Sequence, residues 1–95
     1  MIQGYFMNAV LSVVGKDSVG ILAAVANKCA VYNANINDVN QTIIDDYFTM
    51  YMIINIDKLN IEFNTFVDRI QELGKEKNLE IHCMHEDIFN LMHRI

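Results

Sequence analysis

Proline and tryptophan are absent from this 95-residue sequence, which has only four glycines and two cysteines. Two cysteines are too few to form the disulfide framework of a small secreted domain. The apolar runs are short and interrupted by Asn, Asp or Gly, so none is long enough to span a bilayer. No basic residue precedes the first apolar run, so there is no sign of a secretory signal, and we expect a cytoplasmic protein.

Positive charge is also scarce: seven Lys and Arg residues stand against 12 Asp and Glu residues, for a formal net charge of −5. A surface that binds nucleic acid through its phosphates is therefore not expected. Apolar residues make up 53% of the chain, which is enough for one hydrophobic core. We expect a single folded domain over residues 7–95, with residues 1–6 as an N-terminal extension.

The first part of this domain has the pattern of a strand followed by a helix. A β-branched run over residues 8–14 predicts the strand, which is covered on both sides because its apolar residues fall on both faces. Asp17 or Ser18 is the expected N-cap of the helix, and Asn33 its left-handed C-cap. The apolar residues with helical spacing are Leu22, Val25, Cys29 and Tyr32.

Two further strands are predicted at 36–44 and 48–56. A two-residue turn at Asp45-Asp46 joins them, which indicates an antiparallel hairpin. The alternation of apolar and polar residues slips after Ile36, and such a slip predicts a β-bulge.

A second helix is the clearest element of the sequence. We expect Asn60 or a nearby residue to cap its start, and Gly74 to lie near its end. Alternation over residues 79–83 predicts the fourth strand, and an amphipathic tail over 88–95 predicts a short terminal helix. The apolar stripe of the second helix comprises Phe63, Phe66, Val67, Ile70 and Leu73.

The predicted order is β-α-β-β-α-β plus a terminal helix, which is the ferredoxin-like pattern of the α+β class. We expect a four-stranded antiparallel sheet, both main helices on one face, and right-handed crossovers. The other face of the sheet then carries Tyr47, Thr49, Tyr51 and Ile53. Because that face is too apolar to be left in water, we expect a partner to cover it, most simply a second copy of the chain.

Three segments resemble the ACT-domain family. Residues 7–22 (MNAVLSVVGKDSVGIL) resemble its opening strand and ligand loop, and residues 35–42 (NINDVNQT) resemble the start of its second strand. The ending EDIFNLMHRI at 86–95 resembles one subgroup, the small stand-alone ACT proteins of bacteria and archaea that are similar to the glycine-cleavage-system transcriptional repressor. The resemblance covers nearly all residues from Met7 onward.

This resemblance implies regulation by a small molecule. ACT domains generally bind amino acids or other small effectors and usually pair side by side, with the ligand where the loop after the first strand meets the neighbouring subunit. In this sequence the implied loop comprises Lys16, Asp17, Ser18, Val19, Gly20 and Ile21. The implied opposing segment comprises Asn35, Ile36, Asn37 and Asp38.

The chemistry of these residues suits a zwitterion. Gly20 at the first turn of a helix allows close approach, and free N–H groups there suit a carboxylate. Asp17 or Asp38 is a candidate to receive an ammonium group, and Asn35 or Asn37 to hydrogen-bond either end of an amino acid. Purely structural roles are the alternative: capping by the loop residues, packing of helix on strand at the glycine, and turns at the asparagines.

Four residues near the end of the chain, His82, Cys83, His85 and His93, are candidate metal ligands. Positions 82 and 85 of a strand point to opposite faces, so these histidines cannot easily share one ion. Cys83 and His85 share a face, but two ligands alone make a weak site. We therefore expect structural or exposed histidines, with no metal and no cofactor.

Catalytic and RNA-binding uses of this fold are not expected either. Ser12 and Ser18 have no histidine nearby in the sequence, and Cys29 falls on an apolar stripe. The loop after the first strand has a lysine but not the arginine that an acylphosphatase needs. The Lys/Arg-Gly-Phe core of an RNA-recognition motif is missing, so Tyr47 and Tyr51 are better explained by packing in a dimer interface.

The sequence therefore predicts a non-catalytic regulatory ACT-type protein in the cytoplasm. We expect a homodimer or higher homo-oligomer that binds an amino-acid effector at the subunit boundary, without nucleic acid or membrane. The alternative is an interaction module that binds no ligand and docks another protein through its sheet face or its terminal helix.

Overall fold

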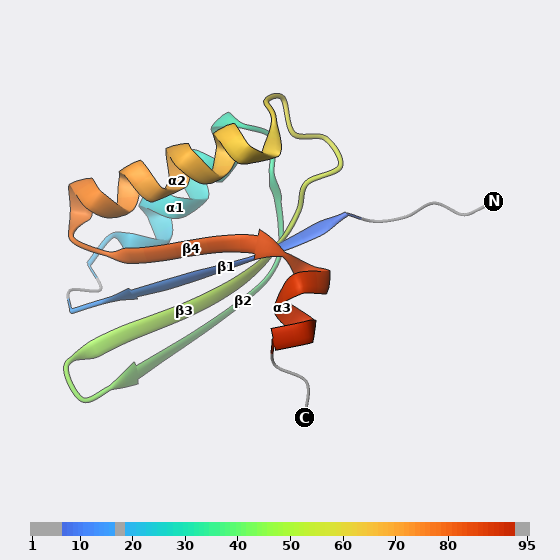
Figure 1. Ribbon diagram of the computed structural model, residues 1–95. Helices are drawn as coiled ribbons and strands as arrows, with labels where there is room; N and C mark the ends of the chain where they lie inside the picture. The colour runs from blue at the N-terminus through green and yellow to red at the C-terminus, as the bar shows by residue number, and fades with distance from the viewer. Residues whose placement is uncertain (1–6, 17–18, 93–95) are drawn as a thin grey trace.

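The computed structural model describes residues 7–16 and 19–92 (Figure 1). The predicted extension at 1–6 and the last three residues of the predicted tail lie outside this part of the chain. The order of elements is the predicted β-α-β-β-α-β with a terminal helix. The elements are β1 (Asn8–Gly15), α1 (Ile21–Val31), β2 (Asn35–Ile44), β3 (Tyr47–Asn55), α2 (Phe63–Lys77), β4 (Glu80–His85) and α3 (Glu86–Met92).

The four strands form one antiparallel sheet in the order β2-β3-β1-β4. Figure 1 shows α1 and α2 together on one face of this sheet, while α3 lies on the other face. The predicted ferredoxin-like α+β fold is therefore confirmed. Because β1 and β2 both run antiparallel to β3, they are parallel to each other, and their N-terminal ends lie at the same end of the sheet.

The core lies between the sheet and the two main helices. Along β3 the predicted alternation holds, since Phe48, Met50, Met52 and Ile54 are all buried. From the helices, the buried side chains include Val25 and Cys29 of α1 and Phe66, Ile70 and Leu73 of α2. Burying an apolar side chain of this size stabilises the fold by roughly 1.5–3 kcal/mol, so these contacts hold both helices against one face of the sheet.

The β2–β3 hairpin has the predicted turn and the predicted bulge. Ile44 pairs with Tyr47, so Asp45 and Asp46 form a two-residue turn, in which Asp45 has a left-handed φ of 54°. The register shifts between Ile36 and Asp38, where the alternation in the sequence slips. Because of this shift, Ile36 and Val39 both lie on the side of β2 that the helices cover.

The start of α1 differs from the prediction. Its N-cap is Gly20, in a left-handed conformation (φ 73°), rather than Asp17 or Ser18. The chain turns at the glycine and the helix begins at Ile21, which is buried, whereas Leu22 lies on the exposed side. At the end of α1 the predicted left-handed conformation of Asn33 (φ 65°) is confirmed, but the C-cap is the preceding residue, Tyr32.

The N-cap of α2 is one of the residues near Asn60 rather than Asn60 itself. The N-cap of α2 is Glu62, which makes no side-chain capping hydrogen bond, whereas Asn60 binds the end of α1 instead. Gly74 lies inside the last turns of the helix and is buried, and Asn78 (φ 58°) ends the helix.

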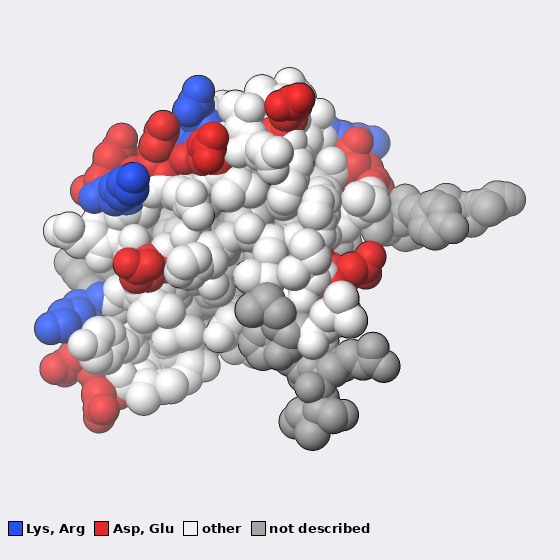
Figure 2. Space-filling model, in the orientation of Figure 1, with Lys and Arg blue, Asp and Glu red and all other residues white. Residues whose placement is uncertain are grey.

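The face of the sheet away from α1 and α2 carries the predicted aromatic residues. Tyr47 and Tyr51 are 48% and 44% exposed, and the Tyr51 ring meets the ring of Phe89 on α3 edge-on, with centroids 6.3 Å apart. In Figure 2 charged side chains gather along α2 and around the β2–β3 turn, while most of the surface between them is uncharged. We call the side of the sheet that α3 touches the open face.

Candidate functional site

The predicted ligand loop joins β1 to α1 at one end of the sheet. Two of its residues, Asp17 and Ser18, lie outside the described residues. The Nζ of Lys16 lies 5.7 Å from the centroid of the Tyr47 ring, a cation–π distance. Ile21 is packed in the hydrophobic core, so only its backbone remains available to a ligand.

Gly20 is the part of this loop whose geometry suits a ligand. A Cβ built on Gly20 meets no described atom within 4 Å, so the glycine does not serve close packing of helix on strand. A glycine is favoured at position 20 because its φ is left-handed. The neighbouring residue, Val19, is 87% exposed. The first N–H groups of a helix have no intrahelical acceptor, and the N-cap here adds no side-chain hydrogen bond. The start of α1 therefore presents backbone donors, and among the described residues no atom fills the space beside the Gly20 Cα.

The opposing segment lies at the beginning of β2. Nδ2 of Asn35 donates to Oδ1 of Asn37 at 3.0 Å, so these two amides lie side by side. Oδ1 of Asp38 accepts the backbone N–H of Val39 at 2.9 Å, which stabilises the bulge. One oxygen of Asp38 therefore has a structural role, and Ile36 packs partly against the core.

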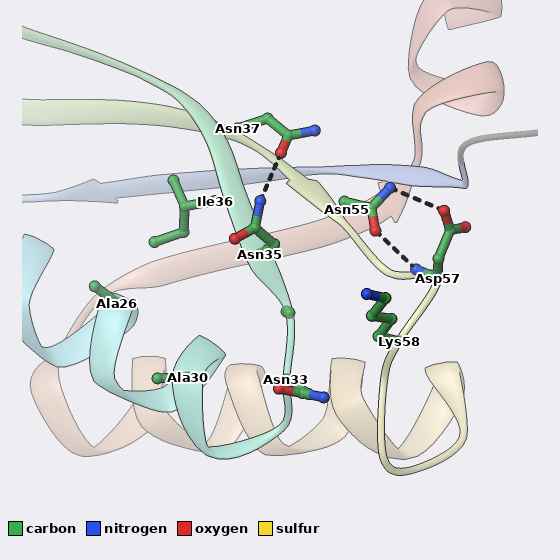
Figure 3. Close-up of a pocket in the computed structure, with 10 residues that line it drawn as sticks. Ala26, Ala30, Asn33, Asn35, Ile36, Asn37, Asn55, Asp57 and Lys58 are labelled. Atoms are coloured by element: carbon green, nitrogen blue, oxygen red, sulfur yellow. Dashed lines mark hydrogen bonds between the residues drawn. The ribbon is translucent and has the colours of Figure 1, made fainter.

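A pocket of about 810 Å³ opens beside this segment (Figure 3). The exposed side of α1 contributes Ala26 and Ala30, two small residues that leave room between the helix and β2. Asparagines dominate the remaining wall, and the segment after β3 adds Asp57 and Lys58. The polar residues that line the pocket are Asn33, Asn35, Asn37, Asn55, Asp57 and Lys58.

The loop and the pocket lie at opposite ends of the sheet in one chain. Gly15, at the loop end, is level with Ile43 of β2, because both are aligned with the same residue of β3. At the other end Asn8 and Asn35 are both aligned with Asn55. The eight residues of β1 separate the two ends by about 23 Å, at a rise of ~3.3 Å per residue. One chain therefore does not bring the two predicted halves of the site together.

Sequence reasoning missed the contribution of Asn55, Asp57 and Lys58 to this pocket. The sequence did hold a signal for Asn55. If the residues of the two strands are paired outward from the Asp45-Asp46 turn, with one extra residue for the bulge, Asn55 is placed opposite Asn35. For Asp57 and Lys58 there was no such signal, because their positions depend on the path of the irregular segment after β3.

Three of the candidate metal ligands near the end of the chain, His82, Cys83 and His85, lie within the described residues. His82 is exposed on β4 beside Glu80, with 3.4 Å between Nε2 and Oε2. His85 lies under the ring of Phe63, with centroids 4.3 Å apart and an angle of 27° between the planes. His93 is outside the described residues. Within the described part of the chain, no three His, Cys, Asp or Glu side chains are grouped to hold a metal ion.

Both cysteines are free thiols, of which Cys29 is buried and Cys83 is half-buried. Burial raises the pKa of the Cys29 thiol from 9.0 to about 11. Burial, with a smaller contribution from Cys29, raises the pKa of the Cys83 thiol to about 12. A thiol held in its protonated form is a poor nucleophile, so these cysteines have the properties of core residues.

Comparison with known proteins agrees with the fold. The ACT domain model matches residues 8–84. A UPF0237 protein of Listeria innocua is 48% identical over 89 residues, which cover 94% of this chain and 100% of that protein. The solved structure of an ACT domain protein from Streptococcus pneumoniae superposes with a TM-score of 0.79 and 35% identity, over 90% of this chain and 96% of that chain.

A more distant structural neighbour is described as a putative glycine cleavage system transcriptional repressor. It superposes with a TM-score of 0.69 at 22% identity and covers 86% of this chain and 47% of that one. At this identity the likeness shows the fold alone. Among the described residues, no helix has both the length and the apolar character needed to cross a bilayer.

Proposed function

This chain belongs to the ACT-domain family, within the UPF0237 group, and we propose that it is a regulatory module that binds a small amino acid across a homodimer interface. The Listeria relative, which this chain matches over its whole length, has no room for a catalytic domain beside its ACT domain. Regulation by binding is therefore a better account of the chain than catalysis.

The observation that carries the proposal is the separation of the two half-sites. The loop between β1 and α1 lies at the end of the sheet where β2 finishes. Asn35 and Asn37 lie at the opposite end, where β2 begins. If the β2 strands of two chains pair antiparallel about a two-fold axis, the N-terminal end of each β2 comes beside the loop of the other chain. Each dimer then has two equivalent sites, and every site takes one half from each chain.

The exposed edge of the sheet supports this pairing. β2 is an edge strand of ten residues without lysine or proline, the residues that often protect such an edge from pairing. The neighbouring surface of α1 carries the small residues Ala23, Ala26 and Ala30, which permit close approach of a second helix. The edge and the helix together form a continuous surface for a second copy of the chain.

The chemistry of each composite site suits an amino acid. Backbone N–H groups at the start of α1 bind the α-carboxylate, assisted by the positive end of the helix dipole. The side-chain oxygens of Asn35 and Asp38 from the other chain accept hydrogen bonds from the ammonium group. Because a ligand held in this way contacts both chains, it stabilises the paired state, and this linkage is the regulatory signal.

The experiment is a thermal-shift screen of common amino acids on the dimer, followed by a mixing test. At 100 times its dissociation constant an effector adds about 2.7 kcal/mol of stability. A loop variant, Gly20→Asn, and a β2 variant, Asn35→Ala with Asn37→Ala, are each expected to lose binding. Mixed and allowed to exchange subunits, they form heterodimers with one intact site. Recovery of binding supports the shared site, and failure to recover it contradicts the proposal.

A ligand-free interaction module is the second candidate, and the open face favours it. Ile44 and Tyr47 of the hairpin and Leu91 of α3 are exposed apolar residues on or beside this face. A screen in which no amino acid shifts the melting temperature, with the dimer intact, would replace the first proposal by this one.

A further inference from the structure

Lys58 places an ammonium group at the pocket beside β2. It is exposed in the segment that follows β3, and both ion pairs found among the described residues lie elsewhere, at Arg69 and at His82. In Figure 3 its Nζ is directed toward β2 and away from the carboxylate of Asp57. Among the residues that line the pocket, Lys58 is the cation and Asp57 the anion.

The carboxylate of Asp57 forms neither of the ion pairs found among the described residues, and both of its oxygens accept hydrogen bonds from other groups. Oδ1 of Asp57 accepts the backbone N–H of Met7 at 2.8 Å, and Oδ2 accepts Nδ2 of Asn55 at 3.2 Å. Oδ1 of Asn55 in turn accepts the backbone N–H of Asp57 at 3.2 Å. These three hydrogen bonds fix the turn that leads into Lys58 and leave its ammonium group available.

The rest of the pocket offers uncharged hydrogen-bonding groups and space. The contact between Asn35 and Asn37 uses one N–H and one carbonyl oxygen, which leaves Oδ1 of Asn35 and Nδ2 of Asn37 for a ligand. Ala26 and Ala30 form a low wall on the α1 side. A cation beside amide groups, in a pocket with small apolar residues, suits a short aliphatic chain that ends in a carboxylate.

We infer that Lys58 binds a second carboxylate on the effector, so that the ligand class is the dicarboxylic amino acids. This inference rests on the proposed function, in which the loop of the other chain takes the α-carboxylate. Lys58 then pairs with the carboxylate of the ligand's side chain. A neutral amino acid leaves the ammonium group unpaired at a site that the dimer encloses, which costs affinity.

Calorimetric titration of the dimer tests this assignment with five probes: L-aspartate, L-glutamate, L-asparagine, L-glutamine and L-serine. Aspartate or glutamate is expected to bind about tenfold or more tightly than its own amide, the size of effect that a hydrogen bond between charged groups gives. The test variant is Lys58→Gln, which keeps most of the side chain and removes its charge. The matched control is Lys77→Gln, the same change at an exposed lysine in the last turn of α2.

Loss of the acid-over-amide preference in Lys58→Gln, with the preference kept in Lys77→Gln, supports the assignment. If the wild-type protein binds neutral amino acids as tightly as dicarboxylic ones, the assignment is wrong while the proposed function stands. The same holds if Lys58→Gln keeps the preference. If none of the five probes binds but another neutral amino acid does, the assignment fails alone, and if no amino acid binds, the proposed function fails as well.

Discussion

Asn60 caps the end of α1 from a position 29 residues further along the chain. Its Nδ2 donates to the carbonyl oxygen of Val31 at 3.0 Å, and its backbone N–H donates to the carbonyl oxygen of Tyr32 at 3.1 Å. Both acceptors belong to the last turn of the helix, where carbonyl groups lack intrahelical donors. The segment between β3 and α2 is therefore tied to α1, next to the pocket that holds Lys58.

Replacing this donor by an acid of the same shape should destabilise the protein. Asn60→Asp removes the hydrogen bond to Val31 and places a negative charge at the C-terminal end of a helix, where the dipole disfavours it, so we expect a loss of about 1–2 kcal/mol. The matched control is Asn64→Asp in the first turn of α2, where a negative charge is favourable. Urea denaturation measures both. A loss no greater in Asn60→Asp than in the control would contradict the capping role.

Strand β3 was predictable because one of its faces is buried. Along β3 the period of two, from Phe48 to Ile54, marks every core residue. The bulge after Ile36 was predictable for the same reason, since without it the apolar residues that follow would leave the core face. Local patterns therefore suffice where burial alone decides the structure.

The exact N-caps were not predictable in the same way. Asp17, Ser18 and Asn60 all have the chemistry of a helix N-cap and stand before helical patterns, yet neither helix uses them as one. The left-handed turn at Gly20 sets the start of α1, and the acceptor of Asn60 is far away in the sequence. A cap that depends on a tertiary contact leaves no local signal.

The candidate site was predictable in part. The family resemblance and the chemistry of the asparagines indicated the beginning of β2, which does line a pocket. Lys58 could not be found in this way, because its place depends on the hydrogen bonds that Asp57 makes with Met7 and Asn55. These contacts link three segments of the chain.

At Gly20 the backbone conformation, rather than the available space, should limit substitution. Gly20→Ala is expected to destabilise the protein by about 1–2 kcal/mol, because a residue with a Cβ is strained at φ 73°. Gly20→Asn should cost less, since Asn tolerates the left-handed region. Thermal and urea denaturation measure both. Equal stability of the Ala variant and the wild type would show that this φ changes or that the turn is not strained.

The two thiols should be protected from alkylation in the folded state. With pKa values of about 11 for Cys29 and about 12 for Cys83, almost no thiolate is present at pH 8. We expect iodoacetamide to label both cysteines only after denaturation. If iodoacetamide labels the native protein as fast as it labels the unfolded chain, the prediction that the fold protects the thiols is wrong.

The same pKa values predict a loss of stability at alkaline pH. Between pH 9 and about 11 the Cys29 thiol is ionised in the unfolded chain but protonated in the folded one, so unfolding releases a proton. The free energy of unfolding then falls by about 1.4 kcal/mol per pH unit for each such thiol. Urea denaturation at pH 8, 9, 10 and 11 measures this slope. The control, Cys29→Ala with Cys83→Ala, should be less stable overall but should show a smaller slope, and identical slopes would contradict the prediction.

The contact between Tyr51 and Phe89 should hold α3 against the open face. Their rings meet at 61° with centroids 6.3 Å apart, an arrangement in which the edge of one ring faces the other. A double-mutant cycle with Tyr51→Leu and Phe89→Leu keeps both positions apolar and is expected to give a coupling of about 0.5–1.5 kcal/mol. The cycle is measured by urea denaturation at one protein concentration, with the oligomeric state of each variant checked by ultracentrifugation. Additive effects of the two changes would show that α3 is held by its other contacts. In that case the α3 contacts with β1 and β4 become the ones to test.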